Sequence, residues 1–212
     1  MRVGTVALVR AEPISFEVFF DYQCPYVYRA SLLLDAVRRE GRELDVRWRY
    51  FSLTQVNSKD DGWTVWGAPA SEPVKGRLAF AAAESARRQH RFEELHSGLL
   101  DARHRERLDL DDPEVVGAVA ERAGLDPQRL KSDLADPSIL DALEADHRHA
   151  SSELGVFGTP TFLFAGGASA YVRLSAPPEQ GNGPLEVLDR LLAVAASEPR
   201  ILESKRPRKP SL

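Results

Sequence analysis

Residues 14–29 read ISFEVFFDYQCPYVYR, and this stretch decides the fold. Its first part, residues 14–22, is short, β-branched and aromatic, which favours a buried strand over a helix. From Pro25 onward the apolar residues recur at helical spacing, and Gly41 follows the run. A proline near the start and a glycine past the end are typical of a helix. The stretch therefore predicts a strand that passes into a helix at Cys24.

The chain continues with a second strand and then a long helical block. Alternating apolar and polar residues predict a strand over 44–53, and residues 54–73 form a polar loop rich in glycine and proline. Residues 74–155 are helical in character. Three Asp-Pro pairs lie in this block, and each is expected to start a helix because Asp caps helices well and Pro suits the first helical position. They are Asp112-Pro113, Asp126-Pro127 and Asp136-Pro137.

The last third of the chain returns to strands. Residues 161–165 predict one strand, Gly166-Gly167 a turn, and residues 171–174 a second strand, so together they predict a hairpin. A final amphipathic helix is expected around residues 185–192. The basic tail, residues 198–212, is expected to be solvated and disordered.

Composition excludes several classes of protein. The 212 residues are 43% hydrophobic and 28% charged, which is enough apolar material for a core. The net charge of −4 does not match nucleic acid, and no apolar run reaches the ~20 residues of a membrane helix. We find no signal peptide pattern and expect a cytoplasmic protein. Its preference for Arg over Lys is a weak indication of a bacterial source.

The chain has 1 Cys, which excludes an internal disulfide and any metal site built from several thiolates. A free cysteine is most often a small buried apolar residue. Cys24, however, is expected at the start of a helix, where free N–H groups and the helix dipole stabilise a thiolate. We therefore interpret Cys24 as a candidate nucleophile.

Two segments together resemble a known family. FFDYQCPYVYRA (residues 19–30) and GVFGTPTFLF (residues 155–164) look like the DsbA-like branch of the thioredoxin superfamily. That branch includes FrnE-type oxidoreductases, kappa-class glutathione transferases and 2-hydroxychromene-2-carboxylate isomerases. The resemblance implies an α/β thioredoxin-like fold with an all-helical insertion domain. Its two halves would be residues 14–73 and 156–197, separated by the insertion at 74–155.

The resemblance also implies roles for individual residues. Cys24 falls on the nucleophile, and Pro25 and Tyr26 fall on the variable dipeptide of the active-site motif. Thr159-Pro160 falls on the loop whose proline is cis, which would present the Thr159 backbone to a peptide-like substrate or thiol next to Cys24.

Val27 departs from the family pattern, because the dithiol members carry a second cysteine at this position. A protein that closes its own disulfide is therefore excluded. One remaining chemistry is oxidoreductase activity on thiols and disulfides, with Cys24 as the single nucleophile and an external small thiol, glutathione or mycothiol, and no covalently bound cofactor. The second is a transferase or isomerase that uses a thiol cofactor and prefers a protonated Cys24. The third is a binding module without catalysis.

The other candidate residues leave alternatives open. Trp63 and Trp66 either line a substrate cleft or cover the helical block. Asp21 either tunes the thiol or serves as a turn residue. His104 is a candidate base that nothing in the sequence places at a site, and the histidine spacings do not favour a metal site. Kappa-class relatives dimerise, which keeps a homodimer open.

Overall fold

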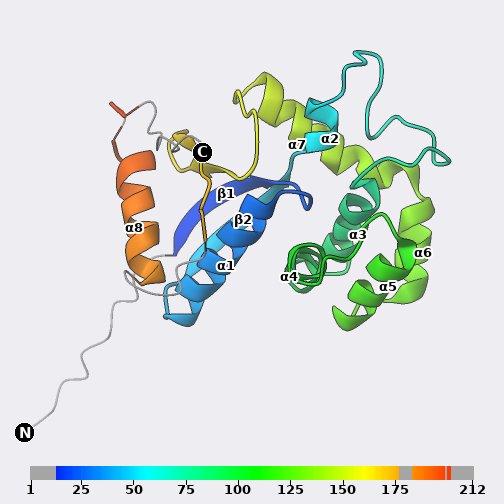
Figure 1. The fold of residues 1–212 in the computed structure, drawn as a ribbon, viewed down its shortest axis with the longest axis horizontal. Helices are drawn as coiled ribbons and strands as arrows, with labels where there is room; N and C mark the ends of the chain where they lie inside the picture. Colours follow the sequence, from blue (N-terminus) through cyan, green and yellow to red (C-terminus); the bar gives the residue numbers. More distant parts are fainter. Residues whose placement is uncertain (1–12, 177–182, 199, 202–212) are drawn as a thin grey trace, which may run out of the picture.

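The computed structural model describes residues 13–176, 183–198 and 200–201. Strands and helices alternate at the start of the chain, helices fill its middle, and a hairpin and a helix end it (Figure 1). In chain order they are β1 (Ile14–Phe20), α1 (Pro25–Arg39), β2 (Leu44–Tyr50), α2 (Leu53–Val56), α3 (Arg77–Arg88), α4 (Phe92–His104), α5 (Pro113–Arg122), α6 (Pro127–Ala135), the 3₁₀ turn η1 (Pro137–Leu140), α7 (Asp141–Ser152), β3 (Thr161–Phe164), β4 (Ser169–Tyr171) and α8 (Pro184–Ala195).

The four strands form one sheet in the order β2-β1-β3-β4. β1 pairs with β2 in parallel, and β3 pairs antiparallel with both β1 and β4. The connection from β1 to β2 is α1, which begins at a proline and ends before Gly41, a glycine with φ +88°. The predicted helix of the opening stretch is therefore found within one or two residues of its expected ends.

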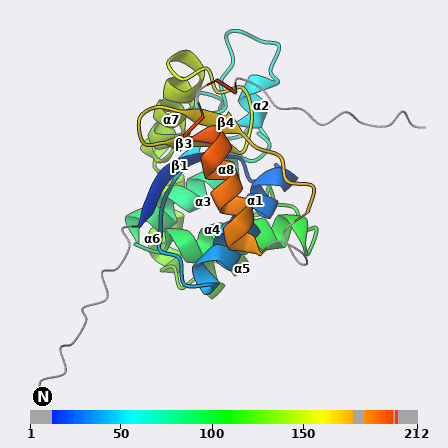
Figure 2. The ribbon, with the colours of Figure 1, turned by 90° about the vertical axis from the view of Figure 1, so that its left-hand side faces the viewer.

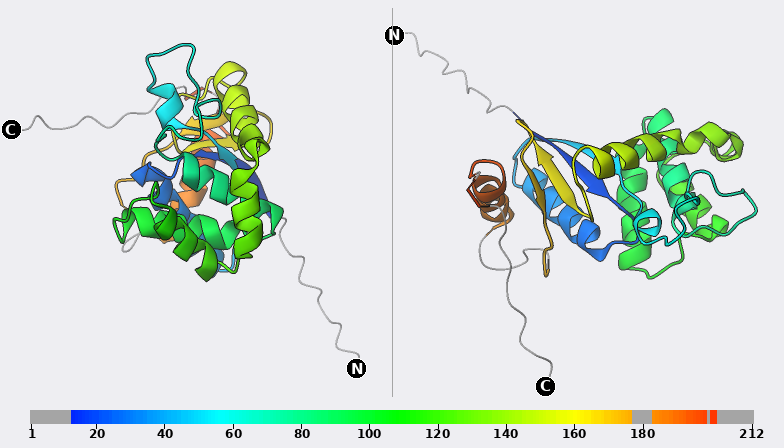
Figure 3. Two further views of the ribbon diagram at one scale, coloured as in Figure 1. Left: turned by 90° about the vertical axis from the view of Figure 1, so that its right-hand side faces the viewer. Right: turned by 90° about the horizontal axis from the view of Figure 1, so that it is seen from above.

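Alternation along β1 gives the sheet two different faces. Phe16, Val18 and Phe20 point to the face that is covered by α1 and α8, and they join the larger core cluster. Phe19 points to the other face and packs with Ala150 of α7. Figures 2 and 3 show α8 beside α1, and the block of helices α3–α7 at the far end of the molecule.

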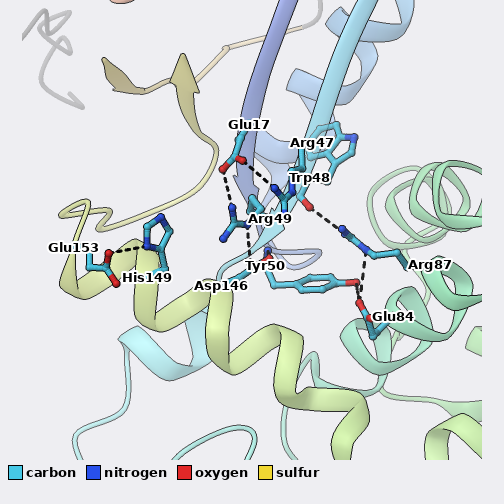
Figure 4. A network of polar contacts seen from close by, with 10 residues as sticks. All are labelled: Glu17, Arg47, Trp48, Arg49, Tyr50, Glu84, Arg87, Asp146, His149 and Glu153. Carbon is cyan, nitrogen blue, oxygen red and sulfur yellow. Dashed lines mark hydrogen bonds and ion pairs between the residues drawn. The ribbon is translucent and has the colours of Figure 1, made fainter. Parts of the chain in front are cut away.

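Polar contacts tie β2 to the helical block (Figure 4). The carboxylate of Asp146 on α7 accepts hydrogen bonds from Arg49 Nε at 2.6 Å and from the Tyr50 N–H at 2.9 Å. Tyr50 donates its hydroxyl to Glu84 on α3 at 3.0 Å, and Arg87 donates to the carbonyl oxygen of Trp48. The insertion is thus held to the edge of the sheet by charged and polar groups as well as by apolar packing.

The second strand is shorter than the sequence predicts. It ends at Tyr50, and Leu53 begins α2 rather than closing the strand. The reason is local capping: the Ser52 hydroxyl accepts the Gln55 N–H at 3.1 Å, and the Asp21 carboxylate accepts the Leu53 N–H at 2.7 Å. Both bonds turn the chain away from the sheet.

The hairpin also differs in register from the expectation. β4 covers Ser169–Tyr171 instead of residues 171–174. The turn at Gly166-Gly167, with both φ values near +90°, places Tyr171 opposite Thr161, the first residue of β3. Pro160 comes before Thr161 and has no N–H to donate, so the last bond between the two segments is the one from the Val172 N–H to the Pro160 oxygen at 3.0 Å. The third Asp-Pro pair starts the 3₁₀ turn η1 rather than an α-helix. Most of the basic tail, residues 202–212 and 199, lies outside the described residues.

Candidate active site

Cys24 stands between β1 and α1 as the residue that caps the helix. Its backbone is extended, with φ −87° and ψ 115°, and its side chain makes no capping hydrogen bond. Pro25 takes the first helical position, where its missing N–H costs nothing. The side chain is 5% exposed. Cys24 therefore lies at the positive end of the helix dipole and is almost wholly buried.

The two motifs, far apart in the sequence, meet at this sulfur. Cys24 Sγ donates a hydrogen bond to the Thr159 carbonyl oxygen at 3.2 Å, across 135 residues. The Thr159–Pro160 peptide bond is cis. The loop is fixed on its other side by Thr161, whose hydroxyl donates to the Gly158 oxygen at 2.7 Å. The proposed nucleophile and the proposed substrate-binding backbone thus face each other.

The residues after Cys24 differ strongly in exposure. Pro25 is exposed, Tyr26 is half-buried, and Val27 is fully buried in the core below. Two arginines contact the Tyr26 ring. Arg173 lies over it at 4.0 Å and donates a hydrogen bond to its hydroxyl, and Arg29 lies 5.2 Å from its centre.

Arg173 and Arg29 come from different parts of the site. Arg173 follows β4, and the hydrogen bond to Tyr26 is the main reason that the pKa of Arg173 is raised. Arg29 belongs to α1 and donates to the Leu174 oxygen at 2.9 Å, which holds the segment after β4 against the helix. The fold brings both arginines to the Tyr26 ring, and no local sequence pattern indicates that they meet there.

Asp21 serves as a turn residue. Its carboxylate accepts the N–H groups of Gln23 and Leu53, both at 2.7 Å, and its carbonyl oxygen accepts the Cys24 N–H at 3.0 Å. Burial raises the pKa of Asp21 to about 6, against the lowering effect of these two N–H donors. The residue fixes the backbone that leads into Cys24.

His104 lies next to this turn. Its Nε2 donates to the Tyr22 carbonyl oxygen at 2.9 Å, and its ring stacks on Tyr28 at 5.4 Å. Burial lowers the pKa of His104, which keeps the imidazole neutral near pH 7. His104 also lines a hollow of about 320 Å³ beside the active-site motif, together with Gln23, Pro25, Arg103 and Arg107.

The two loop tryptophans contact other residues. Trp63 donates its indole N–H to Glu72 at 2.9 Å, and Trp66 lies 5.4 Å from the ring of His147 on α7. In the described part of the chain, neither makes a hydrogen bond or ring contact with Cys24 or Thr159. Trp63 thus contacts its own loop, and Trp66 contacts α7.

Two aromatic side chains that the sequence did not single out stand near the Thr159 loop. Phe157 is 69% exposed and Tyr171 is 39% exposed, and their rings lie 5.0 Å apart. A Cβ at Gly158 would come within 3.2 Å of Tyr171, so the glycine permits this close approach. Their exposure is a property of the folded loop that periodicity does not reveal.

Within residues 13–176, 183–198 and 200–201, no group of three or more His, Cys, Asp or Glu side chains is placed to hold a metal ion. In the same residues, no helix has the length and apolar character needed to cross a bilayer.

A family model described as the DSBA-like thioredoxin domain matches residues 16–192. The chain belongs to the DsbA-like thioredoxin family. The predicted α/β thioredoxin-like fold is thereby confirmed. A DsbA-like domain without a second cysteine has no internal partner for Cys24, and its only described free thiol is the one that meets Thr159.

Solved structures show the same fold. A probable DsbA oxidoreductase from Streptomyces coelicolor is 21% identical, covers 93% of this chain and 94% of its own, and has a TM-score of 0.61. A 2-hydroxychromene-2-carboxylate isomerase is 18% identical, with 90% and 100% covered and a TM-score of 0.58. The cytosolic disulfide reductase DsbM from Pseudomonas aeruginosa, solved with GSH, is 20% identical, with 72% and 86% covered and a TM-score of 0.53.

Proposed function

We propose that this DsbA-like protein is a thiol-disulfide oxidoreductase that uses Cys24 as its single nucleophile and a small external thiol as its partner. The observation that carries the proposal is the position of Cys24, at the N-terminus of α1 and 3.2 Å from the Thr159 oxygen. The partner thiol is of the glutathione or mycothiol type, and we place the reaction in the cytoplasm.

The chemistry follows from a single sulfur. The Cys24 thiolate attacks one sulfur of a disulfide, a new S–S bond forms to Cys24, and the other half leaves as a thiolate that takes up a proton. A second small thiol, deprotonated, then attacks the sulfur bound to Cys24. This step releases a new disulfide and restores the Cys24 thiolate, so one external thiol is consumed and one is released.

Thr159 is proposed to position the substrate. Its carbonyl oxygen accepts the Cys24 S–H in the structure. When Cys24 is deprotonated, it can no longer donate, and the oxygen becomes free for a backbone N–H of a peptide-like substrate. Substrate binding and thiol ionisation would thus use the same oxygen in turn.

The proposal is tested with purified protein and oxidised glutathione, with Cys24→Ala as the control. We expect intact-mass spectrometry to show one glutathionyl group on the native chain and none on the control. Subsequent reduced glutathione should remove it. A native chain that forms no mixed disulfide with either glutathione or mycothiol disulfide would refute the oxidoreductase proposal.

One observation favours a second candidate, a transferase or isomerase that depends on a thiol cofactor. The hydrogen bond from Cys24 to Thr159 requires a protonated sulfur, and a protonated sulfur can donate to a bound cofactor thiolate. In this case reduced glutathione would bind without a mixed disulfide, and Cys24→Ser would keep the binding. A chain that neither binds thiols nor reacts with disulfides would instead be a binding module.

A further inference from the structure

A hollow of about 320 Å³ adjoins the active-site motif. Gln23 and Pro25, the two neighbours of Cys24, form one wall. The other wall consists of Arg103 and His104, at the C-terminal end of α4, and of Arg107, which follows the helix. Because both neighbours of Cys24 line it, a molecule bound in this hollow would lie next to the Cys24 backbone, while the sulfur points to the Thr159 oxygen and is not part of the lining.

The hollow is strongly basic, although the whole chain carries a net charge of −4. No carboxylate lines it. In the described residues, Arg103 and Arg107 form no ion pair; Arg103 makes only a long bond, 3.4 Å, to the Leu108 oxygen. Arg105, between them, is paired with Asp101 at 3.0 Å. The two arginines that face the hollow are thus the ones left without a carboxylate.

His104, the third residue of this wall, does not change the positive charge of the two arginines. His104 is neutral, because burial lowers its pKa, and its Nε2–H is used by the Tyr22 oxygen. Arg107 has φ +62°, a left-handed conformation that is costly for a residue other than glycine. The chain therefore holds a charged side chain at the hollow in spite of its backbone preference.

Gln23 provides an independent observation. Both its amide nitrogen and its amide oxygen are buried without a hydrogen-bond partner in the described residues. Buried amides in folded proteins almost always have partners, because an unmet donor or acceptor loses its hydration and gains nothing in return. The Gln23 side chain lines the hollow, so a turn of its amide toward a bound anion would give the N–H₂ group an acceptor.

We propose that this hollow binds a carboxylate of the small thiol or disulfide that reacts at Cys24. The inference rests on the proposed function and narrows its partner to thiols that carry carboxylates, of which glutathione is one. Arg103 and Arg107 supply charge-assisted hydrogen bonds, and the Gln23 amide adds a neutral donor once its side chain turns toward the hollow. Mycothiol has no carboxylate and would leave the two arginines unpaired, so the site selects against it.

The test uses two disulfides that differ in charge. Oxidised glutathione carries carboxylates, and 2-hydroxyethyl disulfide carries none. In the double variant Arg103→Gln/Arg107→Gln, we expect the rate constant for modification of Cys24 by oxidised glutathione to fall about tenfold or more. The rate constant with 2-hydroxyethyl disulfide should stay within about twofold. Arg122→Gln, an exposed arginine in the last turn of α5, is the control and should change neither rate.

The outcomes separate the two proposals. If the double variant slows both disulfides equally, or neither, the carboxylate site is wrong while the oxidoreductase proposal stands. If native Cys24 reacts with neither disulfide, the oxidoreductase proposal is wrong. The carboxylate site is then tested by calorimetric titration with S-methylglutathione, which has no free thiol. Binding that is tenfold weaker in the double variant than in the native chain supports the site. Equal binding by the two chains, or no binding by the native chain, overturns it.

Discussion

The Cys24 sulfur and the Thr159 carbonyl oxygen are joined by a hydrogen bond of 3.2 Å, although 135 residues separate them. Neither the sulfur nor the carbonyl oxygen forms the candidate site by itself. The first comes from the turn after β1, and the second from the loop before β3, which lies beside β1 in the sheet. Pairing of β1 with β3 is therefore what assembles the site, and the following predictions test the parts that support it.

Val27→Cys should give the protein an internal disulfide. Residues 24 and 27 lie one helical turn apart on the same side of α1, so a thiol at position 27 can reach Cys24. After oxidation, we expect the intact mass to fall by two hydrogens and both thiols to resist alkylation. Val37→Cys replaces another fully buried valine of α1, which is too far along the helix to pair. An internal disulfide that fails to form in Val27→Cys would contradict the placement of position 27.

Asp21 should make stability fall as the pH rises. Its pKa is about 6 when folded, raised from 3.8 mainly by burial, so the folded state holds the proton more tightly than the unfolded state. This contribution is complete below pH 3.8 and is lost through pH 6. The free energy of unfolding of the native chain, relative to Asp21→Asn, should drop by about 3 kcal/mol from pH 3.5 to pH 7. Urea unfolding at several pH values measures it, and a difference that does not change with pH would refute the assignment.

Asp146→Ala should loosen the helical block from the sheet. The substitution leaves the Tyr50 N–H without an acceptor and removes the closer carboxylate from Arg49, which keeps Glu17 at 2.9 Å. We expect the free energy of unfolding to fall by about 2–4 kcal/mol. Glu144→Ala on the same helix removes only the exposed pair with Arg148, and should cost less than about 0.5 kcal/mol. Equal losses of unfolding free energy in the two variants would show that the contacts of Asp146 in Figure 4 stabilise the fold no more than an exposed ion pair does.

Arg173→Gln should slow alkylation of Cys24. The guanidinium lies over the ring of Tyr26, two residues after Cys24, and donates a hydrogen bond to its hydroxyl, so it adds a positive charge to the surroundings of the motif; a cation near a cysteine speeds its reaction with electrophiles. Since Arg173 is exposed, we expect a modest effect, about two- to fivefold at pH 7 with iodoacetamide and smaller at high salt. Lys131→Gln on α6 serves as the control. A rate that is unchanged at low salt would remove Arg173 from the site.

The local parts of this fold could be predicted from the sequence, because their signals lie within a few residues. Cys24-Pro25 and Gly41 mark the ends of α1, and Asp112 and Asp126 cap the helices that follow them, each accepting an N–H of the first turn. These signals act through the chain's own backbone and need no tertiary contact.

Residues brought to the site by tertiary packing could not be predicted. Arg173 and Arg107 lie about 149 and 83 positions from Cys24, and only the pairing of strands and the direction of α4 bring them near it. The family resemblance supplied the Thr159 loop, which spacing alone could not. Trp63 and Trp66 are a further case: the sequence is equally compatible with a cleft and with packing, and only the folded structure shows their contacts with Glu72 and His147.

The buried Val27 also determines how the protein would respond to its surroundings. A chain with two thiols exchanges one disulfide molecule for two thiol molecules when it oxidises, so its state depends on the total concentration of the thiol pool. Under the proposed chemistry, Cys24 alone would exchange one disulfide for one thiol. Its state would then follow the proportion of oxidised to reduced small thiol and be independent of how large that pool is.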